Sequence, residues 1–110
     1  MMKTNAERVL DALGDPTRRL VFKRLRNRTH SVREIADGMD VSRPAVSQHL
    51  KVLKTAGLAV VRAEGTRRLY AIDTRGIEAL RGWLDGFWDK ALVAFKEAAE
   101  REIARERKPR

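Results

Sequence analysis

The sequence predicts a mainly α-helical domain with a small β component, an α+β fold of about five helices and one two-stranded β-hairpin. The first observation is apolar spacing: Val46, Leu50 and Leu53 recur three or four residues apart, as they would on one face of a helix. The second is a pair of short runs, 58–63 and 67–72, that read as strands joined by a turn at 64–66. With 110 residues and no linker-like segment, the chain is expected to form a single domain spanning 1–110.

Two helices are expected before residue 30. The apolar face of the first consists of Ala6, Val9, Leu10 and Leu13. Gly14 and Asp15 end this helix, and Asp15 also caps the second helix, with Pro16 at its first position. The apolar side of the second helix consists of Leu20, Val21, Phe22 and Leu25. We interpret 27–30 as a loop.

Residues 31–56 are predicted to form a short helix, a tight turn and a second helix. The apolar face of the short helix consists of Val32, Ile35, Ala36 and Met39. Gly38 and Asp40 favour a turn, and Ser42 is a suitable N-cap for the next helix. Pro44 falls in the first turn of that helix, where its missing N–H costs no hydrogen bond.

The outer face of this second helix is polar and basic. It carries Ser42, Arg43, Pro44, Ser47, Gln48 and Lys51, with Lys54 beside it. Helix–turn–helix units use such a face to reach base edges in the major groove of DNA. We therefore predict that these first six residues bind DNA, with Arg43, Ser47 and Gln48 on the bases and Ser42 and Lys51 nearer the phosphates. An ordinary surface helical hairpin is the alternative interpretation.

The predicted β-hairpin directly follows this helix and carries Arg62, Arg67 and Arg68 near its tip. A cationic hairpin in this place is typical of the wing of a winged helix–turn–helix, which contacts phosphates or enters the minor groove. A solvated hairpin end with no partner is the alternative.

Three motifs carry a resemblance to a known family. They are ALGDPTR at 12–18, SRPAVSQHLKVL at 42–53 and AGL at 56–58. In order and separation they resemble the ArsR/SmtB-type winged helix–turn–helix repressors, over roughly residues 6–90. The resemblance implies a transcriptional repressor that binds operator DNA as a homodimer. It also implies that the first and last helices pair across a two-fold axis.

Charge and composition agree with a DNA partner. Lys and Arg total 24 against 15 Asp and Glu, a net charge of +9. Residues 1–72 hold 15 basic and 7 acidic side chains, whereas 73–110 hold 9 and 8, so the excess lies with the predicted DNA-binding part. No apolar run approaches a membrane span, and we expect no membrane partner. Cysteine is absent, which excludes disulfides and fits a reducing cytoplasm, where we expect the protein.

A long final helix is expected from Asp73 or Thr74 to about residue 104, with a charged, frayed tail at about 102–110. Two apolar stripes run along it, and one helix cannot bury both against a core of short helices. A second subunit is the natural cover. The predicted dimer contacts are Leu80, Trp83, Leu84, Phe87, Trp88, Ala91 and Phe95, to which the resemblance adds Val9 and Leu10 of the first helix. A fully intradomain core helix and an apolar ligand pocket are the alternatives.

No metal or cofactor is expected. At two positions where many relatives carry metal-binding cysteines, this chain has Ser31 and Arg33, neither of which is a soft ligand. The only histidines are His30, in a loop, and His49, for which a structural role is expected. An oxygen-only cation site at Asp85 and Asp89, one helical turn apart, is the alternative.

Several classes of function compete. The prediction is a sequence-specific repressor that binds an inverted-repeat operator as a homodimer. Its effector is unknown or absent, and a small apolar ligand, a protein partner and simple autoregulation remain open. The alternatives are a metal-responsive repressor with carboxylate or His ligands and a non-specific DNA-compacting protein. A compacting protein needs mainly Lys and Arg, whereas the outer face of 42–51 offers groups that suit groove reading, on Ser42, Arg43, Ser47 and Gln48. An enzyme is rejected, since no nucleophile–base pair or Gly-rich phosphate loop occurs.

Overall fold

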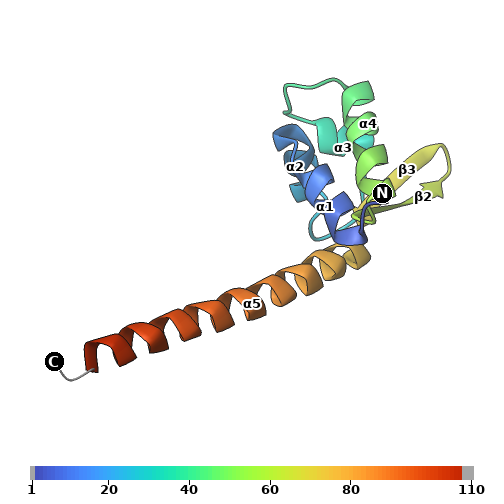
Figure 1. Cartoon of the computed structure of the whole chain (residues 1–110). Helices are drawn as coiled ribbons and strands as arrows, with labels where there is room; N and C mark the ends of the chain where they lie inside the picture. The colour runs from blue at the N-terminus through green and yellow to red at the C-terminus, as the bar shows by residue number, and fades with distance from the viewer. Residues whose placement is uncertain (1, 108–110) are drawn as a thin grey trace. The chain divides into compact units, whose positions relative to one another are not determined.

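The structure is a computed structural model that describes residues 2–107. Its elements, in chain order, are α1 (Asn5–Leu13), α2 (Pro16–Lys23), β1 (His30–Ser31), α3 (Val32–Ala36), α4 (Arg43–Thr55), β2 (Ala59–Glu64), β3 (Arg67–Ile72) and α5 (Thr74–Arg107) (Figure 1). The chain divides into two compact units, one ending at Leu80 and the other beginning at Arg81. The start of α5 therefore belongs to the first unit and most of its length to the second.

Side-chain caps fix the first two helices. Thr4 Oγ1 accepts from the Glu7 N–H at 3.2 Å, and the Glu7 carboxylate accepts from the Thr4 N–H at 3.0 Å. This capping box satisfies two donors at the start of α1. Asp15 caps α2 as predicted, since its Oδ1 accepts from the Arg18 N–H at 3.0 Å. That hydrogen bond to the ionised form lowers the pKa of the Asp15 carboxyl.

The helix–turn–helix follows the predicted pattern except at Met39, which was wrongly predicted on the short helix. The helix α3 ends at Ala36, and Met39 packs against the core from the segment after it. Gly38, with φ of 74°, lies in the turn after α3, a conformation that costs glycine little. Ser42 caps α4, its Oγ accepting from the Ala45 N–H at 3.2 Å. Val46, Leu50 and Leu53 have 0% exposure and form the predicted buried stripe. They pack in a core with Val9, Ala12, Val21, Leu25, Ile35, Leu58, Ala59 and Tyr70.

One residue of the predicted apolar side of α2 is not in the core. Leu20 is 45% exposed, whereas Val21 and Leu25 are buried and Phe22 packs against the core. Leu20 and Val21 are neighbours in sequence and so differ by about 100° around the helix axis. A short helix that presents Val21 to the core turns Leu20 outward, so the prediction for Leu20 was wrong.

The sheet has one strand more than the sequence predicts. β2 and β3 form the expected antiparallel hairpin, with Glu64 opposite Arg67 and Gly65, at φ of 63°, in the two-residue turn. In addition, His30 and Ser31 pair with Tyr70 and Leu69, so the strand order is β1-β3-β2. The predicted loop at 27–30 was therefore wrong at His30, because a two-residue strand is too short to show an alternating pattern.

The start of α5 is held to the end of α4. Asp73 Oδ1 accepts from the Arg75 N–H at 3.0 Å, which confirms Asp73 as the cap. The Gly76 N–H donates to Gly57 O at 2.8 Å, and a Cβ on Gly76 would lie 2.6 Å from that same oxygen. Glycine is therefore required at residue 76 for this approach of the two backbones.

The far end of α5 extends beyond its expected limit. The helix continues through Arg107, past the predicted end at about residue 104. The remainder of the predicted tail, 108–110, lies outside the described residues. None of the helices within residues 2–107 is both long and apolar enough to span a membrane.

Candidate nucleic-acid interface

The nine predicted DNA-binding side chains are all exposed. They are Ser42 before α4, Arg43, Pro44, Ser47, Gln48 and Lys51 on α4, Arg62 on β2, and Arg67 and Arg68 on β3. Burial of Val46, Leu50 and Leu53 on the inner face of α4 leaves the polar residues between them facing outward. The core packing of α4 thus determines which of its side chains are available to a partner.

A groove of about 500 Å³ lies between α4 and the β-hairpin. It is lined by Val32, Ser47, Gln48, Lys51, Lys54, Val61, Arg68 and Tyr70. The structure thus brings Ser47, Gln48 and Lys51 of α4 together with Arg68 of β3. Hydroxyl and amide groups suited to base edges stand here beside cations suited to phosphates. Lys54 was left out of the predicted site, although its three-residue spacing from Lys51 indicates the same face.

The three arginines of the hairpin do not form one cluster. Arg62 lies opposite Leu69, and Arg67 is two residues from Leu69 on the same strand, so both lie on one face of the hairpin. Arg68 lies on the other face and lines the groove beside α4. Arg62 Nη2 is 3.5 Å from Glu64 Oε2, an exposed ion pair within β2.

Arg67 is tied to the helix–turn–helix by Glu34. Its Nη2 lies 3.3 Å from Glu34 Oε1, and Arg28 Nη1 lies 2.9 Å from Glu34 Oε2. Glu34 also accepts from the Ser31 N–H at 3.1 Å as part of the capping box of α3. The hydrogen bond from Arg28, followed by those with Ser31, lowers the pKa of Glu34 to about 2. Sequence reasoning missed this network because Glu34 and Arg67 are 33 positions apart in the sequence, which leaves no local signal.

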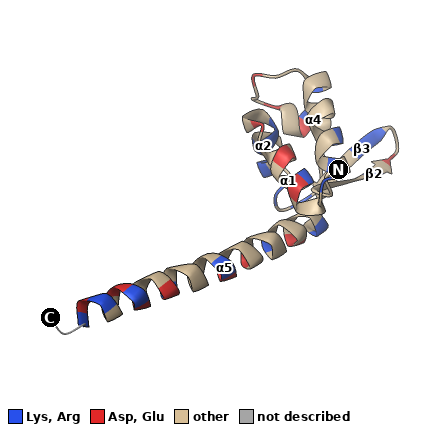
Figure 2. Cartoon of the chain, in the orientation of Figure 1, with Lys and Arg blue, Asp and Glu red and all other residues tan. Residues whose placement is uncertain are grey.

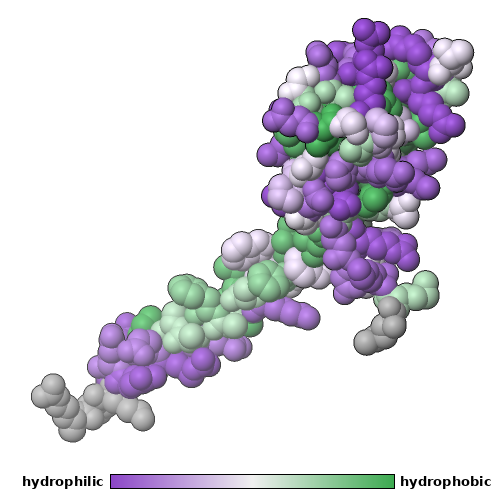
Figure 3. Space-filling view, turned by 90° about the horizontal axis from the view of Figure 1, so that it is seen from above, coloured by the Kyte–Doolittle hydropathy of each residue, from purple (hydrophilic) through white to green (hydrophobic). Residues whose placement is uncertain are grey.

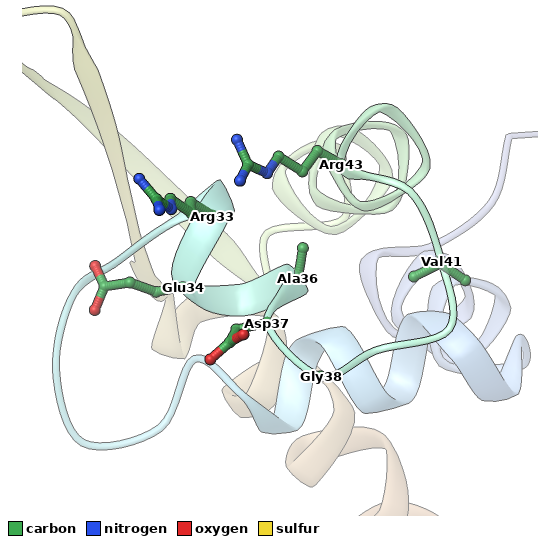
Figure 4. Close-up of a pocket in the computed structure, with 7 residues that line it drawn as sticks. All are labelled: Arg33, Glu34, Ala36, Asp37, Gly38, Val41 and Arg43. Carbon is green, nitrogen blue, oxygen red and sulfur yellow. The ribbon is translucent and has the colours of Figure 1, made fainter.

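Arg43 lies in a different pocket from Gln48. This pocket, of about 550 Å³, is lined by Arg33, Glu34, Ala36, Asp37, Gly38, Val41 and Arg43. Figure 4 shows Arg43 extending from the start of α4 toward α3, where Arg33 lies, while Glu34 points away. Two exposed guanidinium groups therefore flank the turn, and Arg33 is a cation that was not among the predicted DNA-binding residues. Figure 2 shows further Lys and Arg on α4 and β3.

The predicted dimer contacts on α5 are largely exposed. The exposed fractions are 45% for Trp83, 38% for Leu84, 56% for Phe87, 57% for Trp88 and 73% for Phe95. The Trp83 and Phe87 rings stack with centroids 5.9 Å apart. Figure 3 shows apolar residues along the middle of α5 and hydrophilic ones toward its end.

The other four predicted contacts are Val9 and Leu10 on α1 and Leu80 and Ala91 on α5. Val9 has 0% exposure and belongs to the core of the first unit, so it has no surface to offer a second subunit and its assignment was wrong. The three-to-four-residue spacing places Val9 beside Ala6 and Ala12, on the inner face of α1. Leu10, the next residue, is 40% exposed. Leu80 and Ala91 are half-buried, and Leu80 packs against the core.

Ser31, at one of the positions where relatives carry metal ligands, has a structural task. Its Oγ accepts from the Glu34 N–H at 3.2 Å, so it is the N-cap of α3. Within residues 2–107, no three His, Cys, Asp or Glu side chains come together as a metal-binding group.

Comparisons with known proteins agree with this arrangement. A family model described as a helix-turn-helix domain matches residues 13–62. HTH-type transcriptional regulator Rv2034 of Mycobacterium tuberculosis is 49% identical over 96 residues, covering 87% of this chain and 90% of the relative. The HTH-type transcriptional repressor SmtB of the same species is 39% identical over 67 residues, covering 61% of this chain and 50% of that repressor.

A solved structure is similar as well. It is the solution structure of the homodimeric winged helix-turn-helix DNA-binding domain of Mb0332 from Mycobacterium bovis, described as a possible ArsR-family transcriptional regulator. It has a TM-score of 0.61 and 28% identity, covering 78% of this chain and 80% of that chain. The winged helix–turn–helix predicted from the sequence is confirmed, as is the rejection of an enzyme, since the relatives are transcriptional regulators. The chain belongs to the ArsR/SmtB family of winged helix–turn–helix DNA-binding transcriptional regulators.

Proposed function

We propose that this regulator is a sequence-specific repressor that binds an inverted-repeat operator as a homodimer. The observation that carries the proposal is the groove where Ser47, Gln48 and Lys51 of α4 meet Arg68 of the hairpin. A protein that binds DNA through charge alone has no need of an amide and a hydroxyl at such a place. This feature favours base reading over the non-specific compaction that a net charge of +9 would also permit.

The contacts divide into two kinds. Gln48 can form a donor and an acceptor hydrogen bond with the edge of an adenine, and Arg43 can donate two hydrogen bonds to a guanine. The Ser47 hydroxyl can donate or accept, so it suits more than one base. Lys51, Lys54 and Arg68 are suited to phosphates, which fix the position of α4 on the duplex without reading sequence. Arg33 would add a further phosphate contact beside Arg43.

The homodimer is supported by the exposed apolar face of α5. Exposed aromatic patches of this extent mark interfaces, and the similar Mb0332 domain is described as homodimeric. A two-fold dimer presents two copies of α4 and so requires an inverted repeat, with half-sites about 34–36 Å apart or a multiple of that.

Selection of operator DNA from a random pool tests this proposal. The affinity of the wild type for the selected duplex is compared with that for random duplex at near-physiological salt. Gln48→Ala and Arg43→Ala are each expected to cost about 1–3 kcal/mol on the operator and little on random DNA. Arg81→Ala, which removes an exposed cation of α5, is the matched control and should leave the preference unchanged. Equal losses on both duplexes would show that Gln48 and Arg43 only hold the backbone.

A further inference from the structure

A second groove runs along α4, between that helix and α1 and α2. Its volume is about 510 Å³, and its lining is Arg8, Asp11, Ala12, Arg18, Gln48, Lys51, Val52, Thr55 and Ala56. All these residues belong to the first unit. Val52, which is 41% exposed, lies here with Ala12 and Ala56, so part of the lining is apolar.

Three cations line this groove with that apolar surface. They are Arg8, Arg18 and Lys51. The Arg18 guanidinium is held in place, because its Nε donates to Ala12 O at 2.9 Å and its Nη2 lies 3.8 Å from Asp15 Oδ2. Asp11 is the only carboxylate of the lining, and it forms an ion pair with Lys3. The groove therefore offers positive charge beside an apolar surface.

Positive charge beside an apolar surface favours a ligand that has both an anionic group and an apolar body. A charged group of small size, such as a DNA phosphate or inorganic phosphate, gains nothing from Val52 or Ala56. An organic anion with a ring or hydrocarbon body gains from both parts, since its carboxylate meets guanidinium groups and its body covers apolar surface. A fixed guanidinium loses less side-chain freedom on binding than a mobile one.

The groove shares two side chains with the DNA-facing groove. Gln48 and Lys51 line both. A polar group of Gln48 or Lys51 that binds a ligand on the α1 side is not available to DNA on the hairpin side. Ligand and DNA then oppose each other, and each lowers the affinity for the other by the same factor.

We propose that the groove between α1 and α4 binds a small organic anion with an apolar body, an aromatic carboxylate for example, and that its binding weakens DNA binding. The effect on DNA rests on the proposed function, whereas binding of the anion does not.

The first test is a titration of the DNA-free full chain with 1-naphthoate, followed by backbone amide NMR. The amides of Ala12, Val52 and Thr55 are expected to shift in a saturable way, and acetate or inorganic phosphate at the same concentration should not shift them. Val52→Gln should weaken 1-naphthoate binding about fivefold by removing apolar contact. Val60→Gln, at an equally exposed valine of β2, should leave it unchanged.

A second variant, Arg8→Gln, tests the groove independently in case Val52→Gln acts by disturbing the fold. The Arg8 side chain takes no part in the hydrogen bonds and ion pairs found within residues 2–107, so Arg8→Gln removes charge from the groove without breaking a hydrogen bond or an ion pair. It should weaken 1-naphthoate binding several-fold with an unchanged melting temperature.

The second test measures operator affinity with and without saturating 1-naphthoate. A loss of about fivefold or more is expected for the wild type and for Val60→Gln, and a smaller loss for Val52→Gln. The proposal is overturned if shifts are confined to the aromatic residues of α5, if acetate or phosphate acts as well as 1-naphthoate, or if saturation leaves DNA affinity unchanged. A chain that shows no preference for any DNA sequence contradicts the proposed function instead, and the NMR titration still decides the ligand site.

Discussion

The first unit buries the apolar side chains of its helices, whereas the distal part of α5 leaves such side chains exposed. In α4, Val46, Leu50 and Leu53 are fully buried within the unit. In α5, Trp88, Leu92 and Phe95 have the same spacing yet are 57%, 57% and 73% exposed. Helical spacing of apolar residues thus shows that a helix has an apolar face, which is expected to pack against another surface. The spacing does not show whether that surface belongs to the same chain or to a second one.

The contrast has a physical consequence. Burial of apolar surface yields roughly 25 cal/mol per Å², so the core of the first unit stabilises that unit without a partner. The aromatic side chains of α5 gain this free energy only when a second surface covers them. Folding of the first unit and formation of the α5 interface should therefore respond to different substitutions.

Leu84→Glu is expected to have the largest effect. It places a carboxylate on the apolar face of α5, where dimerisation would bury it without a partner. Dissociation would make each half-site bind alone and lower operator affinity by about 10²–10⁴-fold. Leu20→Glu is the matched control, because Leu20 is 45% exposed against 38% for Leu84 but lies on α2. Equal losses of operator affinity in the two variants would contradict the assignment of the interface to α5.

Leu50→Ala tests the buried core of the first unit. It opens a cavity among fully buried residues and should lower the free energy of unfolding by about 2–5 kcal/mol. Leu92→Ala removes a side chain that is 57% exposed in one chain, so its cost should appear as a weaker dimer. Chemical denaturation at several protein concentrations distinguishes the two effects, because only the cost of a weaker dimer depends on protein concentration. The contrast between regions fails if the cost of Leu92→Ala does not depend on protein concentration.

Arg68→Ala should have a smaller effect, visible in salt dependence. Arg68 lines the DNA-facing groove, and loss of one phosphate contact per subunit should flatten the slope of log affinity against log salt by about 1 per subunit. Arg67→Ala should change the slope less, because Arg67 lies 3.3 Å from Glu34 and a phosphate must compete with that carboxylate. If Arg67→Ala changes the slope more than Arg68→Ala, the face assignment of the two arginines is wrong.

The smallest effect is expected for Glu34→Gln and depends on pH. The native pKa of Glu34 is about 2, below the ordinary value of 4.5, so the unfolded chain binds more protons between these values. Stability linked to Glu34 is therefore complete above about pH 4.5 and is lost as pH falls toward 2. Melting temperatures from pH 6 down to about 2 should fall less steeply in Glu34→Gln than in the wild type. Parallel curves would mean that the Arg28 and Arg67 contacts do not hold in solution.

Features that depend on neighbouring residues were predicted well from the sequence. The caps at Asp15 and Ser42, the buried stripe of α4 and the turn at Gly65 each need only a few adjacent side chains. Their chemistry is local, so a single sequence contains it.

Features that depend on distant residues were missed. The strand β1 exists only because β3 lies beside it, and the Glu34–Arg67 pair joins segments that adjoin only in the folded chain. The nearness of Arg33 to Arg43 depends on the path of the turn, which the residue types do not determine (Figure 4). Val9 was placed at the interface because the resemblance implies that the first helix pairs with the last, and the sequence gives no sign of which apolar residues of that helix the core will cover.

Sedimentation equilibrium of the wild type, without DNA and at micromolar concentration, tests the central contrast most directly. If a second copy covers the apolar face of α5, the mass is expected to be twice the chain's 12.6 kDa. A mass of 12.6 kDa across the concentration range would contradict the preformed dimer and leave the exposed aromatic residues of α5 for another partner.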